Sequence, residues 1–478
     1  MINIKNDILI FLSLILASIF IHYYLPSLLG YIWFILLLIG FLISKNRYNY
    51  LWIVLFLLLF SSPGYLFYER GIYNLPIISL PGFDRAIIYS ELFAILAIIK
   101  ALIYPVKQNI FYREPLLILI GYSIFLLFLG LIMGMGIFTF LKSIRYFFPI
   151  LLLLLLPRLI PYHNVPNTIV LLFISAIILV FAQYFDVIFG YPIAFILGET
   201  KIMFSGQEVG EDLRTFDVTI GPVRTIYGPF ILLLSIVSGI AILVEKKVKL
   251  EPLYIYIVIS IATLGILTSA VRGWVIGVAL IFSGIAYIKK YNFGIYLFTI
   301  LLILIVLLSV PNISLQIEQA INRIMTIESL VKGDLTADGT LKRLTERGPR
   351  VMNKYWQSPI FGFGFSDEYY EYSDSHVGNQ TLLLNGGAIG YAIFLYFILF
   401  FLYRYYIIYK IYNIKSMFIF ICGLLALFTI HSTSRMIFGY SLNVETAISL
   451  SLFFFFSDYF LKKPFIIQNE NNSYHHIA

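Results

Sequence analysis

Apolar runs of membrane-spanning length recur from one end of this 478-residue chain to the other. The hydrocarbon core of a bilayer is about 30 Å thick, so a spanning helix needs ~20 mostly apolar residues. In lipid, every backbone polar group must be bonded within the protein, and only helices and closed barrels achieve this. The runs are continuous rather than alternating, and only 12% of the residues are charged. The sequence therefore predicts an all-α polytopic integral membrane protein.

Charged residues, prolines and glycines divide the apolar sequence into about fourteen predicted spans. They cover residues 7–25, 28–44, 49–64, 85–104, 115–134, 140–157, 166–188, 224–244, 252–269, 273–288, 292–310, 383–403, 416–430 and 441–460. With the N-terminus in the cytoplasm, the short basic loops all fall on the cytoplasmic face, as the positive-inside rule expects. These loops hold Lys45/Arg47, Lys107/Arg113, Arg158, Lys246/Lys247/Lys249, Lys289/Lys290, Lys410/Lys415 and Lys462/Lys463.

Two long connections then lie on the extracytoplasmic side, and binding or catalytic residues concentrate in such connections. The predicted organisation is an N-terminal transmembrane bundle (1–188), a first long connection (189–223), central transmembrane helices (224–310), a large connection with short helices (311–382), C-terminal transmembrane helices (383–460) and a cytoplasmic tail (461–478). Isoleucines at helical spacing predict an amphipathic helix in the large connection, at Ile313, Ile317, Ile321 and Ile324. Gly348 and Pro349 predict a kink or two short helices after it.

Basic residues also occur on the extracytoplasmic side of the predicted topology. The positive-inside rule does not account for them there, so another role is expected. The arginines of this set are Arg145, Arg214, Arg224, Arg272, Arg343, Arg347, Arg350 and Arg435. The planar fork of arginine matches phosphate oxygens bidentately, so several such groups together would hold a diphosphate. Each could instead anchor lipid headgroups or pair with a nearby acid, as Arg214 could with Glu211 or Asp212. Arg272 lies in the tight turn "TSAVRGW" with no acid within several positions, which favours anion binding.

His376 is the only histidine in the large connection and directly precedes a predicted span. A neutral imidazole can accept a proton from a hydroxyl group near neutral pH. The alternative is a histidine with a purely structural role. Upstream, "SPIFGFGF" contains Gly362 and Gly364, and the absence of a flanking strand and helix argues against a nucleotide loop. We expect a tight turn that returns the connection to the bundle.

The motif "WQSPIFGFG", followed by His376 and then by Leu383, Gly387 and Gly390, resembles the O-antigen polymerase and O-antigen ligase superfamily. "TSAVRGW" is similar to the serine-arginine-glycine hairpin of that family, with Ala270 and Val271 inserted before Arg272. "GPVRTIYGPFILL", with Arg224, resembles the segment that enters the following span. The family usually has asparagine directly after the histidine, whereas this chain has Val377.

The resemblance implies a metal-independent membrane glycosyltransferase at the outer face of the bacterial inner membrane, with no cofactor. The donor would be an oligosaccharide on polyprenyl (undecaprenyl) diphosphate, the acceptor a sugar hydroxyl. His376 would act as general base and the arginines would bind the diphosphate. Membrane lipids are further expected partners and a chain-length regulator is a candidate one, whereas no nucleic acid is expected.

About fourteen spans and two arginine-bearing outer connections favour a polysaccharide polymerase over a ligase, which resembles a twelve-span pattern. A ligase, which transfers the glycan to lipid A core, remains the alternative because the motifs of the two classes overlap. A polysaccharide flippase or other transporter is the alternative from a different class. Transporters usually carry charges near mid-membrane and have short outer loops, unlike the pattern seen here.

Overall fold

The computed structural model describes residues 4–25, 27–61, 76–78, 87–189, 193, 202–204, 207–209, 226–245, 250–269, 271–288, 294, 301, 305, 308, 310–318, 321 and 343–474. Helices dominate this part of the chain, as predicted. Those of the first half are α1 (Ile4–Tyr24), α2 (Ser27–Ile43), η1 (Asn46–Tyr48), α3 (Asn49–Leu59), α4 (Tyr89–Ile103), α5 (Arg113–Ile132), α6 (Ile137–Phe147), η3 (Phe148–Leu151), α7 (Leu152–Leu155), η4 (Leu156–Leu159), η5 (Tyr162–Asn164) and α8 (Val165–Phe189).

The helices of the second half are α10 (Pro229–Glu245), α11 (Pro252–Thr268), α12 (Arg272–Ile288), the π-helical turn η8 (Arg343–Arg347), α16 (Gly348–Tyr355), α17 (Asp367–Tyr372), α18 (Gly378–Tyr412), α19 (Lys415–Thr433) and α20 (Val444–Tyr474). Two small antiparallel hairpins accompany them. One pairs β1 (Pro76–Ile78) with β2 (Ile87–Ile88), and the other pairs β3 (Ile202–Phe204) with β4 (Gln207–Val209).

Seven helical segments in the described residues are long and apolar enough to cross a membrane. They are Ile4–Tyr24, Arg113–Ile132, Ile137–Leu159, Tyr162–Phe189, Gly378–Tyr412, Lys415–Thr433 and Val444–Lys462. Four shorter apolar helices are Leu28–Ile43, Pro229–Glu245, Pro252–Thr268 and Arg272–Ile288. The chain is thus a polytopic membrane protein, but its described residues do not reach the predicted fourteen spans. In the predicted spans 49–64 and 85–104, the described helices are α3 and α4, of 11 and 15 residues, and most of 292–310 lies outside the described residues.

Proline explains why the predicted span 140–157 is a series of short helical pieces. Pro149 and Pro157 each occupy the first turn of a new element, η3 and η4. Proline has no backbone N–H and clashes with the preceding turn, so a helix that meets it is interrupted and restarts. The pieces still follow one another from Ile137 to Leu159, and they count as one candidate span.

Helix α20 forms the centre of the bundle. Its residues 444–460 are all buried, including the run of four phenylalanines from Phe453 to Phe456. A helix that is apolar all round is buried on every side, and the sequence of α20 has no polar stripe within that run. Helix α20 also continues to Tyr474, through most of the residues predicted as the cytoplasmic tail.

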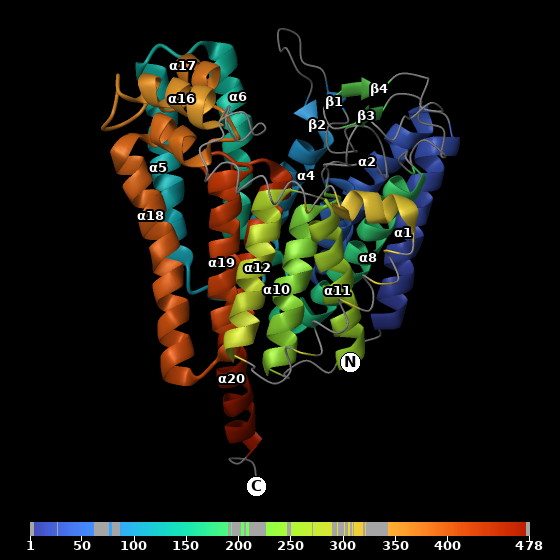
Figure 1. Ribbon diagram of the computed structural model, residues 1–478. Coiled ribbons are helices and arrows are strands. Elements are labelled where there is room, and N and C mark those ends of the chain that lie inside the picture. Colours follow the sequence, from blue (N-terminus) through green and yellow to red (C-terminus); the bar gives the residue numbers. More distant parts are fainter. Residues whose placement is uncertain are drawn as a thin grey trace.

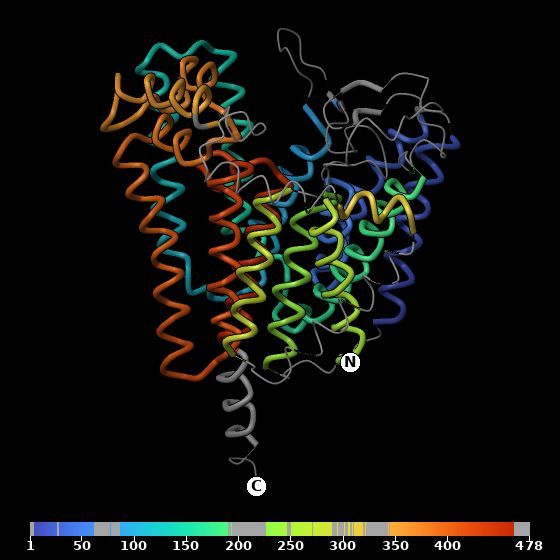
Figure 2. The backbone as a smooth tube through the Cα atoms, viewed as in Figure 1, coloured from blue at the N-terminus to red at the C-terminus, as the bar shows by residue number. Residues whose placement is uncertain are grey.

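The two ends of the bundle carry different elements. Hydrogen bonds join the basic loops at one end: Asn46 donates to the Tyr104 carbonyl (3.1 Å), Val106 to that of Arg158 (2.7 Å) and Asn164 to that of Arg47 (2.9 Å). Figure 1 shows α16 and α17 at the opposite end, which we call the α16 end. Figure 2 shows the long arm of α18 running from the α16 end to the other end of the bundle.

The amphipathic helix predicted in the large connection is described only in part. Residues 311–318 are helical, Ile313 is fully buried and Ile321 is exposed. The remaining residues of that prediction, including Ile324, lie outside the described part. The predicted break at Gly348–Pro349 is confirmed, because the π-helical turn η8 ends at Arg347 and α16 begins at Gly348 with Pro349 in its first turn.

Candidate functional site

A polar hollow of about 450 Å³ opens at the α16 end of the bundle. Its lining residues come from three pieces of chain: the turn η8, helix α16 and the link between α17 and α18. They are Glu346, Arg347, Arg350, Asp374 and His376. Four of the five are charged. Three of the five, Arg347, Arg350 and His376, were predicted as site residues from the sequence.

The helical spacing of the arginines brings them together. Arg343, Arg347 and Arg350 are four and three positions apart, so they share one face of the η8–α16 segment. Val351 and Tyr355, on the neighbouring face of α16, are buried and fix the segment to the bundle. Arg343 donates to the Thr433 carbonyl at the end of α19. The polar face of α16 is therefore held toward the hollow.

The glycine turn predicted from "SPIFGFGF" is confirmed. Gly362 and Gly364 have φ values of +70° and +55°, in the region that glycine adopts most readily. Phe363 donates its backbone N–H to the Leu384 carbonyl (2.9 Å), and Gly364 donates to that of Asn385 (2.9 Å). The turn therefore bonds directly to the backbone of α18.

Helix α18 is broken where this turn meets it, and the break has a backbone cause. Gly387 has φ +63° and ψ −168°, a combination that is essentially restricted to glycine. Beyond the break, Ala388 and Ile389 donate their N–H groups to the carbonyls of Pro359 (2.8 Å) and Ile360 (3.2 Å). The turn thus replaces the helical hydrogen bonds that the break removes. Gly390 lies against Tyr122 and Tyr440, so this part of α18 packs closely against its neighbours.

His376 lies in the link just before α18, and backbone groups fix its ring. The backbone N–H of His376 donates to Asp374 Oδ1 (2.8 Å), and its ring Nδ1 lies 3.2 Å from the Ser434 carbonyl. A carbonyl can only accept, so this contact requires a proton on Nδ1. The Arg343 guanidinium lies 3.5 Å from the same nitrogen. A guanidinium can only donate, and a protonated Nδ1 cannot accept its hydrogen bond. The shorter contact therefore assigns the Nδ1–H tautomer and leaves Nε2 as a proton acceptor.

The turn that receives His376 is itself fixed from inside the bundle. His431 is fully buried, and its Nδ1 accepts the N–H groups of Ile437 (3.1 Å) and Phe438 (3.2 Å). Met436 donates to the Ser375 carbonyl (2.6 Å), beside His376. This internal histidine therefore holds residues 434–438 in the conformation that presents the Ser434 carbonyl to the ring of His376.

Charges in the hollow are nearly balanced. Arg347 Nε lies 3.7 Å from Asp374 Oδ2, a loose ion pair in which 41% of the arginine side chain remains exposed. Glu346 supplies a second acid and Arg350 a second cation. Carboxylates accept hydrogen bonds from sugar hydroxyls while guanidinium groups bind phosphate oxygens, so this mixture suits a ligand that carries both.

Two more predicted arginines flank the turn that holds His376. Arg435 directly follows Ser434, and Arg272 begins α12, whose next residue, Gly273, packs against Thr433 and Ser434. Neither is among the five residues that line the hollow. Both arginines therefore adjoin, in the chain, residues of or against the turn that orients the His376 ring.

Arg145 is not brought to the hollow. Its Nε and Nη2 lie 3.0 Å and 2.7 Å from the two carboxylate oxygens of Glu91 on α4, in a bidentate ion pair. An apolar groove of about 190 Å³ between α4 and α6 adjoins this pair. Arg214 and Arg224, also predicted to bind the diphosphate, lie outside the described residues.

Glu346, Asp374 and Ser434 were not predicted as site residues. Asp374 had a signal, because an aspartate that precedes a residue by two positions often accepts its backbone N–H, and "DSH" has that spacing. Glu346 lies between two predicted arginines, where it could only be taken as their partner. Ser434 acts through its backbone carbonyl, which no sequence pattern marks.

The tyrosines of α17 are buried beside the hollow-forming segment. Burial raises the pKa of Tyr369 and that of Tyr370, whose hydroxyl lies 3.0 Å from Ser143 Oγ. Both phenols therefore stay protonated near neutral pH. Lys142 of α6 lies over the Tyr370 ring, 4.2 Å from its centroid, so α17 and α6 are joined by a cation–π contact.

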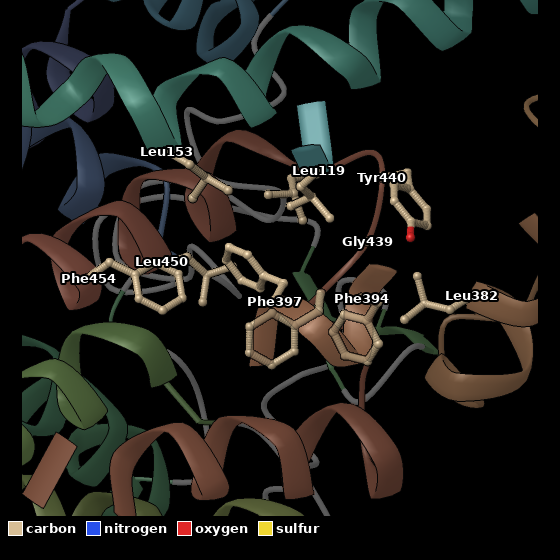
Figure 3. A pocket seen from close by; sticks show the side chains of 11 residues that line it. Leu119, Leu153, Leu382, Phe394, Phe397, Gly439, Tyr440, Leu450 and Phe454 are labelled. Atoms are coloured by element: carbon tan, nitrogen blue, oxygen red, sulfur yellow. The ribbon is translucent and has the colours of Figure 1, made fainter. Parts of the chain in front are cut away.

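An interior void contrasts with the hollow. Figure 3 shows leucine and phenylalanine side chains of α5, α7, α18 and α20 around it, with the Tyr440 hydroxyl at one edge. Its volume is about 10 Å³, and Tyr440 donates its hydroxyl to the Gly390 carbonyl. A space of that size, lined almost entirely by carbon, is a packing defect rather than a ligand site.

No family profile, curated protein or solved structure matches this chain. Within the described residues, histidine, cysteine and acidic side chains do not form any group of three or more that could hold a metal ion.

Proposed function

We propose that this protein is a polysaccharide polymerase that transfers a glycan from a polyprenyl diphosphate to a hydroxyl of another lipid-linked repeat unit. The site would lie on the extracytoplasmic face of the bacterial inner membrane. The observation that carries the proposal is the joint lining of one hollow by His376, Arg347 and Arg350, at the end of the bundle opposite the basic loops. The resemblance of the motif around His376 to the O-antigen polymerase and ligase superfamily supports the same chemistry.

The reaction needs one proton acceptor and one stabilised leaving group. The acceptor hydroxyl oxygen forms a bond to the anomeric carbon of the donor sugar while the bond from that carbon to the diphosphate oxygen breaks. Nε2 of His376 takes the hydroxyl proton, and the departing polyprenyl diphosphate carries the bonding electron pair. The Nδ1 contact with Ser434 (3.2 Å) supports this role, because in the neutral imidazole it makes Nε2 the nitrogen that can accept a proton.

Arginines would stabilise the charge on the leaving diphosphate. Arg350 and Arg347 supply bidentate donors to phosphate oxygens, and Arg343 adds a third cation next to the imidazole. Arg272 and Arg435, which adjoin Gly273 and Ser434 in the chain, would extend the set. The two acids of the hollow would accept hydrogen bonds from the sugar, which orients the acceptor hydroxyl toward Nε2.

The topology proposed with this function is the one inferred from the basic loops. The end that carries those loops faces the cytoplasm, and the hollow faces the opposite compartment. The long connections 189–223 and 311–382 then lie on the same side as the hollow. Arg214 of the first connection and Arg224, which directly follows it, would complete the diphosphate site.

Reconstitution tests the proposal directly. The purified protein in liposomes receives polyprenyl-diphosphate-linked repeat units as the sole glycan, and the products are separated on a gel. A polymerase converts them into a ladder of longer lipid-linked glycans. A ligase makes no ladder and forms a product only when lipid A core is supplied, and a transporter makes no new glycosidic bond, so either result rejects the proposal.

Gene deletion provides the matching test in cells. A surviving lipid A core that bears a single repeat unit indicates a lost polymerase. Core alone indicates a lost ligase or flippase, and accumulation of lipid-linked polymer then identifies the ligase.

A further inference from the structure

An uncharged segment of twelve residues lies between the hollow and the surface of the bundle. It runs from Tyr355 to Ser366, in the sequence "YWQSPIFGFGFS", and is bracketed by Lys354 and Asp367. In its first half, Trp356, Ile360 and Phe361 are 66%, 57% and 45% exposed. In its second half, residues 362–366 are all buried. Three large apolar side chains therefore face outward from a stretch whose neighbours are folded inward.

Contacts with α5 show where this segment lies along the axis of the bundle. Phe365 donates its N–H to the Leu126 carbonyl (3.2 Å), and the ring centroid of Phe361 lies 5.9 Å from that of Phe125. Leu126 precedes the end of the candidate span at Ile132 by six residues. At 1.5 Å per residue, the contact therefore lies about 9 Å inside that end.

The exposed side chains continue a lipid-facing surface. On α5, the exposed apolar residues nearest to the segment are Ile124, Phe125 and Phe128, and α18 contributes Ile389. Both helices are candidate membrane spans. Phe361 thus meets Phe125 of α5, and the Ile360 carbonyl accepts from Ile389 of α18.

The backbone of the segment meets the condition that lipid imposes. Irregular backbone at membrane depth is tolerated only where the protein itself bonds its polar groups. Here the N–H groups of Phe363, Gly364 and Phe365 donate to carbonyls of α18 and α5, and the carbonyls of Pro359 and Ile360 accept from α18 beyond its break. The Asn385 side chain donates to the Gly364 carbonyl (2.6 Å).

We propose that residues 355–366 form a re-entrant segment in the lipid leaflet at the α16 end, with Trp356, Ile360 and Phe361 in contact with the interfacial layer of the membrane. Tryptophan and other aromatic residues favour that layer. Since α16 connects Arg350 to Trp356 in less than two turns, the anchor fixes the height of the hollow relative to the lipid surface. This inference does not depend on the proposed function.

Depth-dependent fluorescence quenching tests the proposal. A protein that keeps Trp356 alone, made by the changes Trp33→Phe, Trp52→Phe and Trp274→Phe, is reconstituted into phosphatidylcholine nanodiscs. Lipids brominated near the headgroup should lower its emission roughly twofold, and lipids brominated near the chain ends should lower it less. The matched control keeps only Trp274, which is 4% exposed, and should respond weakly to both lipids.

Two results would overturn the proposal. One is quenching of Trp356 by aqueous acrylamide with no response to brominated lipid, which would place the side chain in water. The other is a lipid response that appears only at low protein-to-lipid ratio and vanishes as copies associate, which would identify a second copy as the occupant.

A second measurement, which keeps the other three tryptophans, covers the case in which the single-tryptophan variant fails to fold. Cys422 is the single cysteine of the chain and is buried, so Cys422→Ala with Trp356→Cys gives one site for a nitroxide label. The label should collide more often with dissolved oxygen than with a water-soluble nickel chelate. The reverse order would contradict a lipid contact.

Discussion

Two arginine-bearing regions of this protein differ in whether the guanidinium group is already satisfied. In the hollow, Arg347 is 3.7 Å from Asp374 and 41% of its side chain is exposed. Between α4 and α6, Arg145 makes a 2.7 Å contact within a bidentate pair with Glu91, and 23% of its side chain is exposed. A loosely paired, exposed arginine can accept a phosphate, whereas a tightly paired one must first lose its carboxylate. The comparison teaches that the position of an arginine near the membrane surface does not by itself make it a ligand-binding group.

The largest effect is expected at the imidazole of the hollow. His376→Ala should lower glycan transfer by ~10²- to 10⁴-fold, the usual contribution of a general base, while the protein still inserts into the membrane. Ladder formation by reconstituted protein measures the loss. His163→Ala, at an exposed histidine in η5, is the matched control and should leave the ladder unchanged. Equal activity of the His376 variant and the parent protein would remove the hollow from the reaction.

A smaller loss is expected from Arg347→Lys, which retains the charge of the hollow and removes the fork. Charge-assisted hydrogen bonds contribute about 1.5–3 kcal/mol, so transfer should fall roughly 10- to 100-fold. Steady-state rates over a range of donor concentrations provide the measurement. Arg404→Lys, on the exposed face of α18, serves as the control. An unaffected rate would mean that Arg347 only pairs with Asp374.

The break in α18 should affect glycan transfer by positioning the link that bears His376, without itself contacting the substrate. Gly387→Ala places a Cβ against the Ile360 carbonyl and forces alanine into a backbone region restricted to glycine, at a cost of about 1–3 kcal/mol. Thermal unfolding in detergent should occur at lower temperature, and transfer should fall because the link bearing His376 shifts. Gly121→Ala in α5, where no atom lies within 4 Å of the new Cβ, should preserve both properties. Similar behaviour of the two variants would show that the break has no role in the site.

The smallest effect on transfer is expected at the tightly paired arginine. Arg145→Met leaves the largely buried Glu91 carboxylate without its partner, which should cost about 1–3 kcal/mol of stability and leave the transfer rate nearly unchanged. Combining it with Glu91→Gln should recover much of the lost thermal stability. A large fall in transfer with unchanged stability would reverse the comparison and return Arg145 to the diphosphate site.

Much of the site could be predicted because its residues are close in sequence. Arg343, Arg347 and Arg350 share a helical face, and the glycines of "FGFG" predicted a turn back onto the bundle. The roles of the individual arginines could not be assigned in this way. Glu91 and Arg145 are 54 residues apart, and nothing in the sequence near either residue predicts their pairing.

The sequence alone determined that the chain is helical and polytopic, and where most of its described helices begin and end. These properties follow from local hydropathy, proline and glycine, and charge, which act within one or two turns of helix. The tertiary structure decided which carbonyl orients His376, where α18 breaks and which arginine remains available. Those features depend on contacts between segments that are distant in sequence, such as Ser434 with His376, and only packing of the whole bundle selects them.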